Sequence, residues 1–141
     1  MLKVFCVFIV NLILLGCQVL PTVELDQIDG YWEIQFVQQQ NETFKNKQTN
    51  LLYDFYSTEN NIGIYKKVAP QIDGSFQTSK SAVSFEIIKD NGDFMLQFSS
   101  PWNTWVKKIK HLDSEKLVLF KEERSFHYRR PVISKIPIKN E

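Results

Sequence analysis

Residues 83–98 read Val-Ser-Phe-Glu-Ile-Ile-Lys-Asp-Asn-Gly-Asp-Phe-Met-Leu-Gln-Phe and contain two alternating apolar runs around a polar turn. The alternating apolar positions are Val83, Phe85 and Ile87 before the turn and Phe94, Leu96 and Phe98 after it. A period of two is typical of a strand with one buried face. Asn91-Gly92 favours the positive φ angles of a type I′ turn. The stretch therefore predicts an antiparallel β-hairpin.

The same period recurs on both sides of this hairpin, with turn-forming residues between the runs at roughly 8–12-residue intervals. We expect strands at residues 30–37, 51–56, 62–68, 76–89, 94–98, 105–112, 116–120 and 125–130. Residues 38–50 are polar except for Phe44, so we expect a loop there. No segment has the 3.6-residue period of a helix. The pattern predicts an all-β fold, an antiparallel up-and-down barrel of about eight strands, because closure removes the edges that invite aggregation.

The N-terminal segment has a different character. Lys3 precedes an apolar run from Val4 to Leu15, and Gly16-Cys17 follows. The run is shorter than the roughly 20 apolar residues of a spanning helix, and its order of parts is typical of a secretory signal. It resembles a bacterial lipoprotein signal, in which the cysteine after a small residue receives the lipid.

That resemblance implies cleavage after residue 16 and an acylated Cys17, attached to a membrane of the bacterial envelope by more than one acyl chain. Gln18, in place of an aspartate, favours the outer membrane. The alternatives are an ordinary secretory signal or a short uncleaved anchor. We expect a signal peptide at 1–16, a lipidated tether at 17–28, a barrel domain at 29–131 and a tail at 132–141.

Composition narrows the classes of partner. The chain has 17 Lys and Arg against 16 Asp and Glu, and removal of Lys3 would balance them. That balance gives no reason to expect nucleic-acid binding. Cys6 would leave with the signal and Cys17 would carry lipid, so no disulfide can stabilise the domain. The core must therefore come from side-chain packing, and 11 Phe, 5 Tyr and 3 Trp supply it.

Both ends of the expected domain resemble lipocalins. Gly30-Tyr31-Trp32 resembles the Gly-x-Trp of their first strand, and Arg130 follows the last expected strand, where lipocalins have a basic residue that packs across that tryptophan. The resemblance is to small bacterial lipocalin-like lipoproteins and covers most of residues 28–131. It implies that Trp32 and Arg130 close one end of the barrel, through a cation–π contact of about 0.5–2 kcal/mol. Alternation with Phe126 and Tyr128 favours Arg130 over Arg129.

An eight-stranded barrel either is filled by side chains or holds one small ligand. We interpret Tyr53, Phe55, Phe85, Phe94 and Phe98 as inward aromatic residues that either line an apolar pocket or fill the core. Trp105, Lys107 and Ile109 share one face of their strand and Val106 and Lys108 the other, which we interpret as a solvated strand face rather than a nucleic-acid or polysaccharide surface.

We find no candidate catalytic residues, metal site or cofactor site in the sequence. His111 and His127 lack the spacing of zinc ligands, and no serine lies in a Gly-x-Ser-x-Gly motif. The first hypothesis is therefore a non-enzymatic, membrane-anchored barrel that binds a small apolar ligand at its open end. The alternative is a structural or partner-binding accessory lipoprotein of the envelope, with a filled barrel.

Overall fold

The computed structural model describes residues 22–45, 47, 52–78 and 80–132. The expected signal peptide, Cys17 and nearly all of the expected tail lie outside these residues. The elements are a short 3-10 helix, η1 (Leu25–Gln27), and the strands β1 (Gly30–Gln39), β2 (Glu42–Lys45), β3 (Tyr53–Glu59), β4 (Ile62–Pro70), β5 (Phe76–Thr78), β6 (Val83–Asp90), β7 (Asp93–Ser99), β8 (Thr104–Leu112), β9 (Lys116–Lys121) and β10 (Arg124–Arg129).

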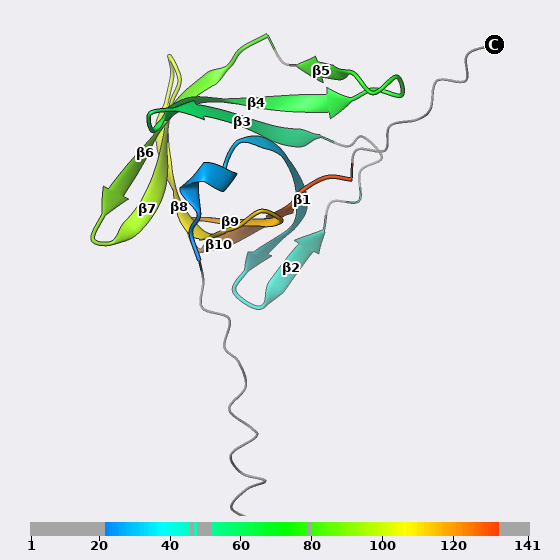
Figure 1. Cartoon of the computed structure of the whole chain (residues 1–141). Helices are drawn as coiled ribbons and strands as arrows, with labels where there is room; N and C mark the ends of the chain where they lie inside the picture. Colours follow the sequence, from blue (N-terminus) through cyan, green and yellow to red (C-terminus); the bar gives the residue numbers. More distant parts are fainter. Residues whose placement is uncertain (1–21, 46, 48–51, 79, 133–141) are drawn as a thin grey trace, which may run out of the picture.

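Eight of these strands close into an up-and-down barrel. Hydrogen-bonded neighbours run in the order β1, β3, β4, β6, β7, β8, β9 and β10, and β10 pairs back with β1. Every pairing between named strands is antiparallel, and β1 curves around to meet both β3 and β10 (Figure 1). The expected all-β, antiparallel, up-and-down barrel is therefore confirmed.

The central hairpin forms as the sequence predicts. Asp90 pairs with Asp93. The two residues between this pair, Asn91 and Gly92, have φ angles of 48° and 85°. These angles match a type I′ turn, whose twist fits that of the flanking strands. The turns at Asn60-Asn61 and Glu122-Glu123 also have two residues with positive φ.

Two expectations about the strands are wrong. The expected loop at 38–50 contains the end of β1 and all of β2, which pairs with the C-terminal half of β1. The expected single strand at 76–89 is two strands: β5 pairs with the end of β4, and β6 pairs with its beginning. Both extra strands carry few apolar residues, so they lack the alternation by which the other strands are recognised.

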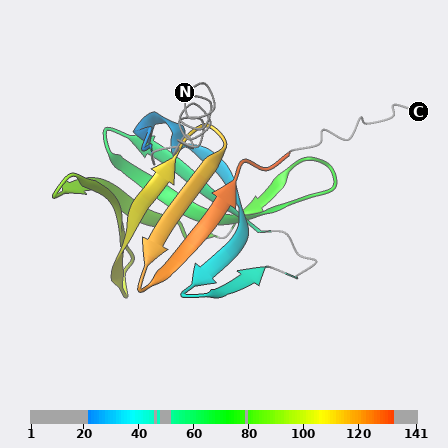
Figure 2. The ribbon, with the colours of Figure 1, turned by 90° about the horizontal axis from the view of Figure 1, so that it is seen from below.

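The two ends of the barrel differ. At one end, η1 lies beside the end of β8 (Figure 2). Beneath it are Ile28, Trp32, Leu112 and Leu117, all with 0% of their surface exposed. We call this the closed end. The other end, where β1, β7 and β9 finish, is called the open end.

Residues 22–28, expected to be the last part of a tether, are instead part of the fold. Val23 pairs with Leu112 in an isolated bridge, and Leu112 N donates to Thr22 O at 2.8 Å. Ile28 is in the core. In the part of the chain that the structure describes, no helix has the length and apolar character needed to cross a membrane.

Candidate functional site

Arg130 and Trp32 meet at the closed end. The guanidinium carbon of Arg130 lies 3.8 Å from the centroid of the Trp32 ring. The buried indole Nε1 of Trp32 donates to the carbonyl of Ile28 at 2.8 Å. The indole is thus held by the carbonyl of Ile28, which directly follows η1, and its ring is covered by a cation, a geometry that favours a cation–π contact.

Arg130 also binds four backbone carbonyls. Nη1 donates to Asp29 O at 2.8 Å and to Tyr31 O at 3.3 Å, Nε donates to Ser114 O at 3.2 Å, and Nη2 donates to Gln27 O. Burial lowers the pKa of Arg130, and the charge of Asp29 opposes that shift. Only a planar, multi-donor group can reach these carbonyls together. Arg130 therefore ties η1, β1 and the β8–β9 turn to the end of β10.

The inner wall can be read from strand pairs, because directly opposite residues of antiparallel strands lie on the same face. Fully buried Trp32 is opposite Asp54, and Asp54 is opposite Lys67. Tyr53 is opposite Glu33, and Phe55 is opposite Tyr31. Asp54 and Tyr56 therefore face inward, while Tyr53 and Phe55 face outward.

This orientation corrects the expectation that Tyr53 and Phe55 point into the barrel. Phe55 instead packs against Tyr31 on the outer face, with ring centroids 4.9 Å apart, and Tyr31 stacks on Phe76 of β5 at 4.2 Å. Tyr53 is near Phe76 as well, at 6.4 Å. The short strand β5 thus covers an external aromatic cluster.

The other three aromatic candidates lie at or in the core. Phe85 and Phe98 are 2% and 1% exposed and contact each other, with centroids 5.7 Å apart. Phe94 is partly buried and packs against the same cluster, and Lys89 Nζ lies 5.1 Å from its ring. Phe85 and Phe98 therefore fill the interior rather than line an open space.

The face of β8 that carries Trp105, Lys107 and Ile109 is also an inner face, which corrects its interpretation as solvated. Lys107 is opposite the fully buried Leu96. Trp105 is opposite Phe98, and the two rings stack with centroids 5.2 Å apart. The outward residue Lys108 instead forms an ion pair with Asp93.

The open half of the inner wall is less enclosed than the closed half. Inward-facing Ile34, Val83, Trp105 and Phe126 are only partly buried, whereas Ile28, Trp32, Leu112 and Leu117 at the closed end have no exposed surface. Solvent therefore reaches side chains inside the open half, and its inner wall is where a small molecule could make contact.

Polar groups occupy the middle of this wall. Asp54 is 2% exposed, and its Oδ1 accepts hydrogen bonds from Lys67 Nζ and from Tyr65 Oη, the latter at 3.3 Å. Burial raises the pKa of Tyr65, and the charge of Asp54 and the hydrogen bond to it add to that effect. Burial likewise raises the pKa of Tyr56 and of Tyr128, again reinforced by Asp54. Asp54 is thus the charge at the centre of a tyrosine cluster.

Sequence reasoning missed this group. Its signal was present in the alternation of Asp54 and Tyr56 against Tyr53 and Phe55, but both faces of that stretch carry aromatic residues. Only pairing with Trp32 decides which face is inside.

The histidines lie outside the barrel interior. His111 Nε2 is 2.8 Å from Asp113 Oδ2, and His127 stacks on Phe36 at 4.2 Å. Burial lowers the pKa of His127. Burial tends to raise the pKa of Asp113, but hydrogen bonds from the backbone of Glu115, from His111 and from the backbone of Lys116 lower it to about 2. No group of three metal-ligating side chains occurs among residues whose positions are described.

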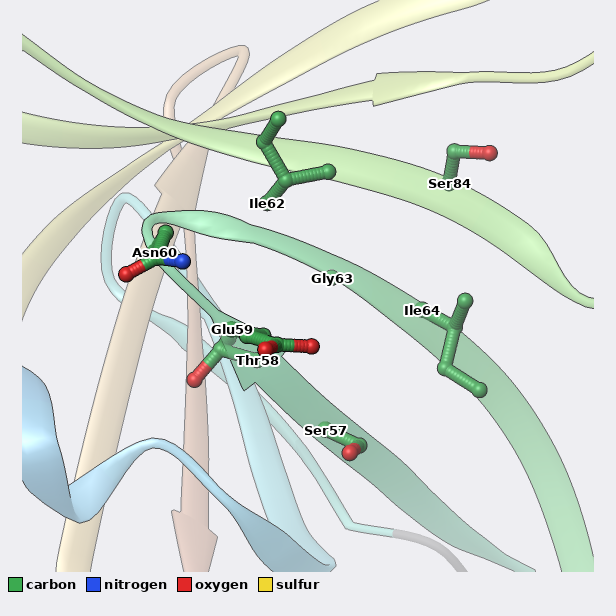
Figure 3. Close-up of a pocket in the computed structure, with 8 residues that line it drawn as sticks. All are labelled: Ser57, Thr58, Glu59, Asn60, Ile62, Gly63, Ile64 and Ser84. Atoms are coloured by element: carbon green, nitrogen blue, oxygen red, sulfur yellow. The ribbon is translucent and has the colours of Figure 1, made fainter.

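A wide depression of about 700 Å³ lies on the β3–β4 hairpin (Figure 3). Its lining residues are Ser57, Thr58, Glu59, Asn60, Ile62, Gly63, Ile64 and Ser84. Ile62 and Ile64 are 61% and 40% exposed there. A side chain at Gly63 would not fit, since its Cβ would lie 2.7 Å from the ring of Phe85. The lining contains one carboxylate and no nucleophile–base pair, so it suits contact with another surface better than catalysis.

Comparison with known proteins identifies no family for this chain, since no protein-family model and no curated protein matches it. Among solved structures, it is similar to a lipocalin-like protein from Bacteroides uniformis ATCC 8492, with 12% sequence identity and a TM-score of 0.46. That similarity covers 74% of this chain and 98% of the other. The barrel architecture itself follows from the strand pairing described above.

Proposed function

We propose that this chain is a lipid-anchored binding protein of the bacterial cell envelope, and that the open end of its barrel takes a small ligand with an apolar body. The anchor rests on the signal-like residues that lead to Cys17. The binding role rests on the inner wall. We assign no catalytic step to the chain.

One observation carries the binding role: inward-facing side chains around Trp32 are fully buried, whereas those of the open half are only partly buried. The closed half provides a dry core that includes Ile28, Trp32 and Leu117. The open half leaves Trp105 and Phe126 partly exposed, although they face inward. Binding sites for small molecules are mostly apolar with a few polar groups, and this part of the wall has that composition.

An anchor at Cys17 would also orient the barrel. Thr22 is at the closed end, where its carbonyl accepts from Leu112 N. Five residues span at most about 18 Å, so lipid at Cys17 would hold the closed end near the membrane. Ligand would then enter the open end from the aqueous side.

The anchor is tested by expressing the full chain in a bacterium and measuring the mass of its N-terminal peptide. We expect a diacylglyceryl thioether on Cys17 and membrane recovery of the protein. The Cys17→Ser variant should lack the lipid and be released from the membrane. An unmodified cysteine in the membrane-bound wild type would refute the anchor.

The binding role is tested separately, by native mass spectrometry of the full chain purified from its membrane. We expect a co-purified small molecule that is released when the protein unfolds. Complete absence of bound molecules, together with no binding of added amphiphiles, would refute the role.

The alternative is a partner-binding accessory protein, favoured by the exposed Ile62 and Ile64 beside the outer depression. In that case Ile62→Lys should abolish recovery of an envelope protein with the chain and leave small-molecule binding unchanged. Retention of the partner in the variant would exclude this surface.

A further inference from the structure

Lys107 places an ammonium group inside the barrel. Its Nζ lies 5.0 Å from the ring centroid of Phe126 and 5.6 Å from that of Phe98. Burial lowers the pKa of Lys107. Within the described part of the chain, no carboxylate forms an ion pair with it. This partly buried ammonium lies against two aromatic faces, and its three donors can also bind an acceptor brought by a ligand.

The charged groups around Lys107 do not neutralise its positive charge. Asp54 is the carboxylate of the inner wall whose charge acts on Lys107, and it is already paired with Lys67. Lys67 and Lys121 both act on Lys107 with the same sign of charge. Lys121 has a partner only at the exposed rim, where its Nζ is 3.1 Å from Glu122 Oε1. The inner wall therefore has a surplus of positive charge.

We propose that the ligand is a single-chain amphiphile with an anionic head group, such as a carboxylate, and that Lys107 binds this head inside the barrel with Lys67 and Lys121. This assignment rests on the proposed binding function. The closed half is filled, so the apolar chain extends from the head toward the open end along Trp105 and Phe126. Asp54 is a positioning residue that holds Lys67 on the inner wall.

The test compares three probes of equal chain length on the purified full chain at pH 7: decanoate, decanol and decyltrimethylammonium. We expect decanoate to bind at least about tenfold more tightly than the other two, as measured by calorimetry and by quenching of tryptophan fluorescence. Added salt should weaken decanoate binding more than decanol binding, because salt screens only the charged contact.

Lys107→Met is the decisive variant, since methionine keeps an unbranched chain between the two rings and removes the charge. It should lose about tenfold in decanoate affinity and change decanol affinity by less than about twofold. Lys108→Met is the matched control, because the neighbouring lysine faces outward and pairs with Asp93; it should bind all three probes like the wild type. Lys121→Gln, at the partly exposed rim, provides a second test if Lys107→Met fails to fold.

The outcomes separate the two proposals. Equal affinity for the three probes would overturn the anionic head group and leave a general apolar site. Failure of all three to bind would overturn the binding function and this inference with it. An unchanged preference for decanoate in both Lys107→Met and Lys121→Gln would overturn the assignment of the lysines.

Discussion

Replacing Arg130 by lysine should lower the free energy of unfolding by about 2 kcal/mol, although the charge is kept. The guanidinium covers the Trp32 ring at 3.8 Å and donates to four carbonyls, those of Gln27, Asp29, Tyr31 and Ser114. An ammonium is a point donor on a flexible stem. It can retain one or two of these acceptors, but not all four.

The magnitude follows from what is lost. Hydrogen bonds to charged groups contribute about 1.5–3 kcal/mol when buried, and less where solvent competes. Two of the four acceptors of Arg130 are part-buried and two are exposed. The lysine variant loses two or three of these hydrogen bonds but retains part of the cation–π contact, which contributes about 0.5–2 kcal/mol. The expected net loss in the free energy of unfolding is therefore about 2 kcal/mol.

The assay is urea unfolding of the full chain at pH 7, monitored by tryptophan fluorescence. Wild type and variant are compared on the condition that the dependence of the free energy of unfolding on urea concentration, the m-value, is the same in both. Arg129→Lys is the control: Arg129 is 50% exposed and pairs with Glu33, at 3.0 Å. Such surface pairs contribute about 0.2–1 kcal/mol, so this variant should remain near wild type. A change below about 0.5 kcal/mol for Arg130→Lys, or an equal loss in the control, would refute the role of the guanidinium geometry.

Four further changes test other parts of the barrel by the same unfolding assay. Trp32→Ala should cost about 3–5 kcal/mol, because the ring is fully buried; a loss under about 1 kcal/mol would remove the closed end from the core. Gly63→Ala should cost about 1–3 kcal/mol, since the added Cβ lies 2.7 Å from the Phe85 ring, and an unchanged midpoint would contradict that packing. Tyr56→Phe should be neutral or stabilising, because it deletes an unpartnered hydroxyl; destabilisation would indicate a partner for that group. Folding lowers the pKa of Asp113 from 3.8 to about 2, so the ionised carboxylate contributes to stability above pH 3.8, and this contribution is lost as the pH falls through 2. The difference in free energy of unfolding between wild type and Asp113→Asn should therefore shrink between pH 3.8 and pH 2. A difference that stays constant over that window would exclude the ionised carboxylate as its source.

The fold could be predicted from sequence because its determinants are local. Alternation of apolar residues and turns such as Asn91-Gly92 define each hairpin within about ten residues. In an up-and-down barrel each strand pairs mainly with its sequence neighbours, so the order of hairpins already gives most of the topology. The strands β2 and β5 could not be predicted, because their residues are mostly polar and their positions depend on the ends of β1 and β4.

The candidate site was harder to predict, because alternation defines two faces without saying which one is inside. At Tyr53–Tyr56 both faces carry aromatic residues, and burial of the Asp54 face depends on pairing with Trp32, more than twenty residues earlier in the chain. The same ambiguity at Trp105–Ile109 made an inward lysine look solvated. In both places a charged residue lies inside, against the general tendency that assigns charge to solvent.

Those inward charges become understandable when the two halves of the barrel are considered together. The closed half concentrates stability in Ile28, Trp32 and Leu112, and in the Arg130 bonds that hold η1 over them. The open half can then contain polar groups that do not stabilise the fold, as functional sites often do. Substitutions in the two halves should therefore have opposite effects on stability. Conservative changes near Trp32 should destabilise the fold, whereas Lys107→Met should leave the free energy of unfolding unchanged or raise it, and should weaken decanoate binding. Loss of stability in Lys107→Met comparable to that in Arg130→Lys would mean that the lysine serves the fold, and that this division of roles is wrong.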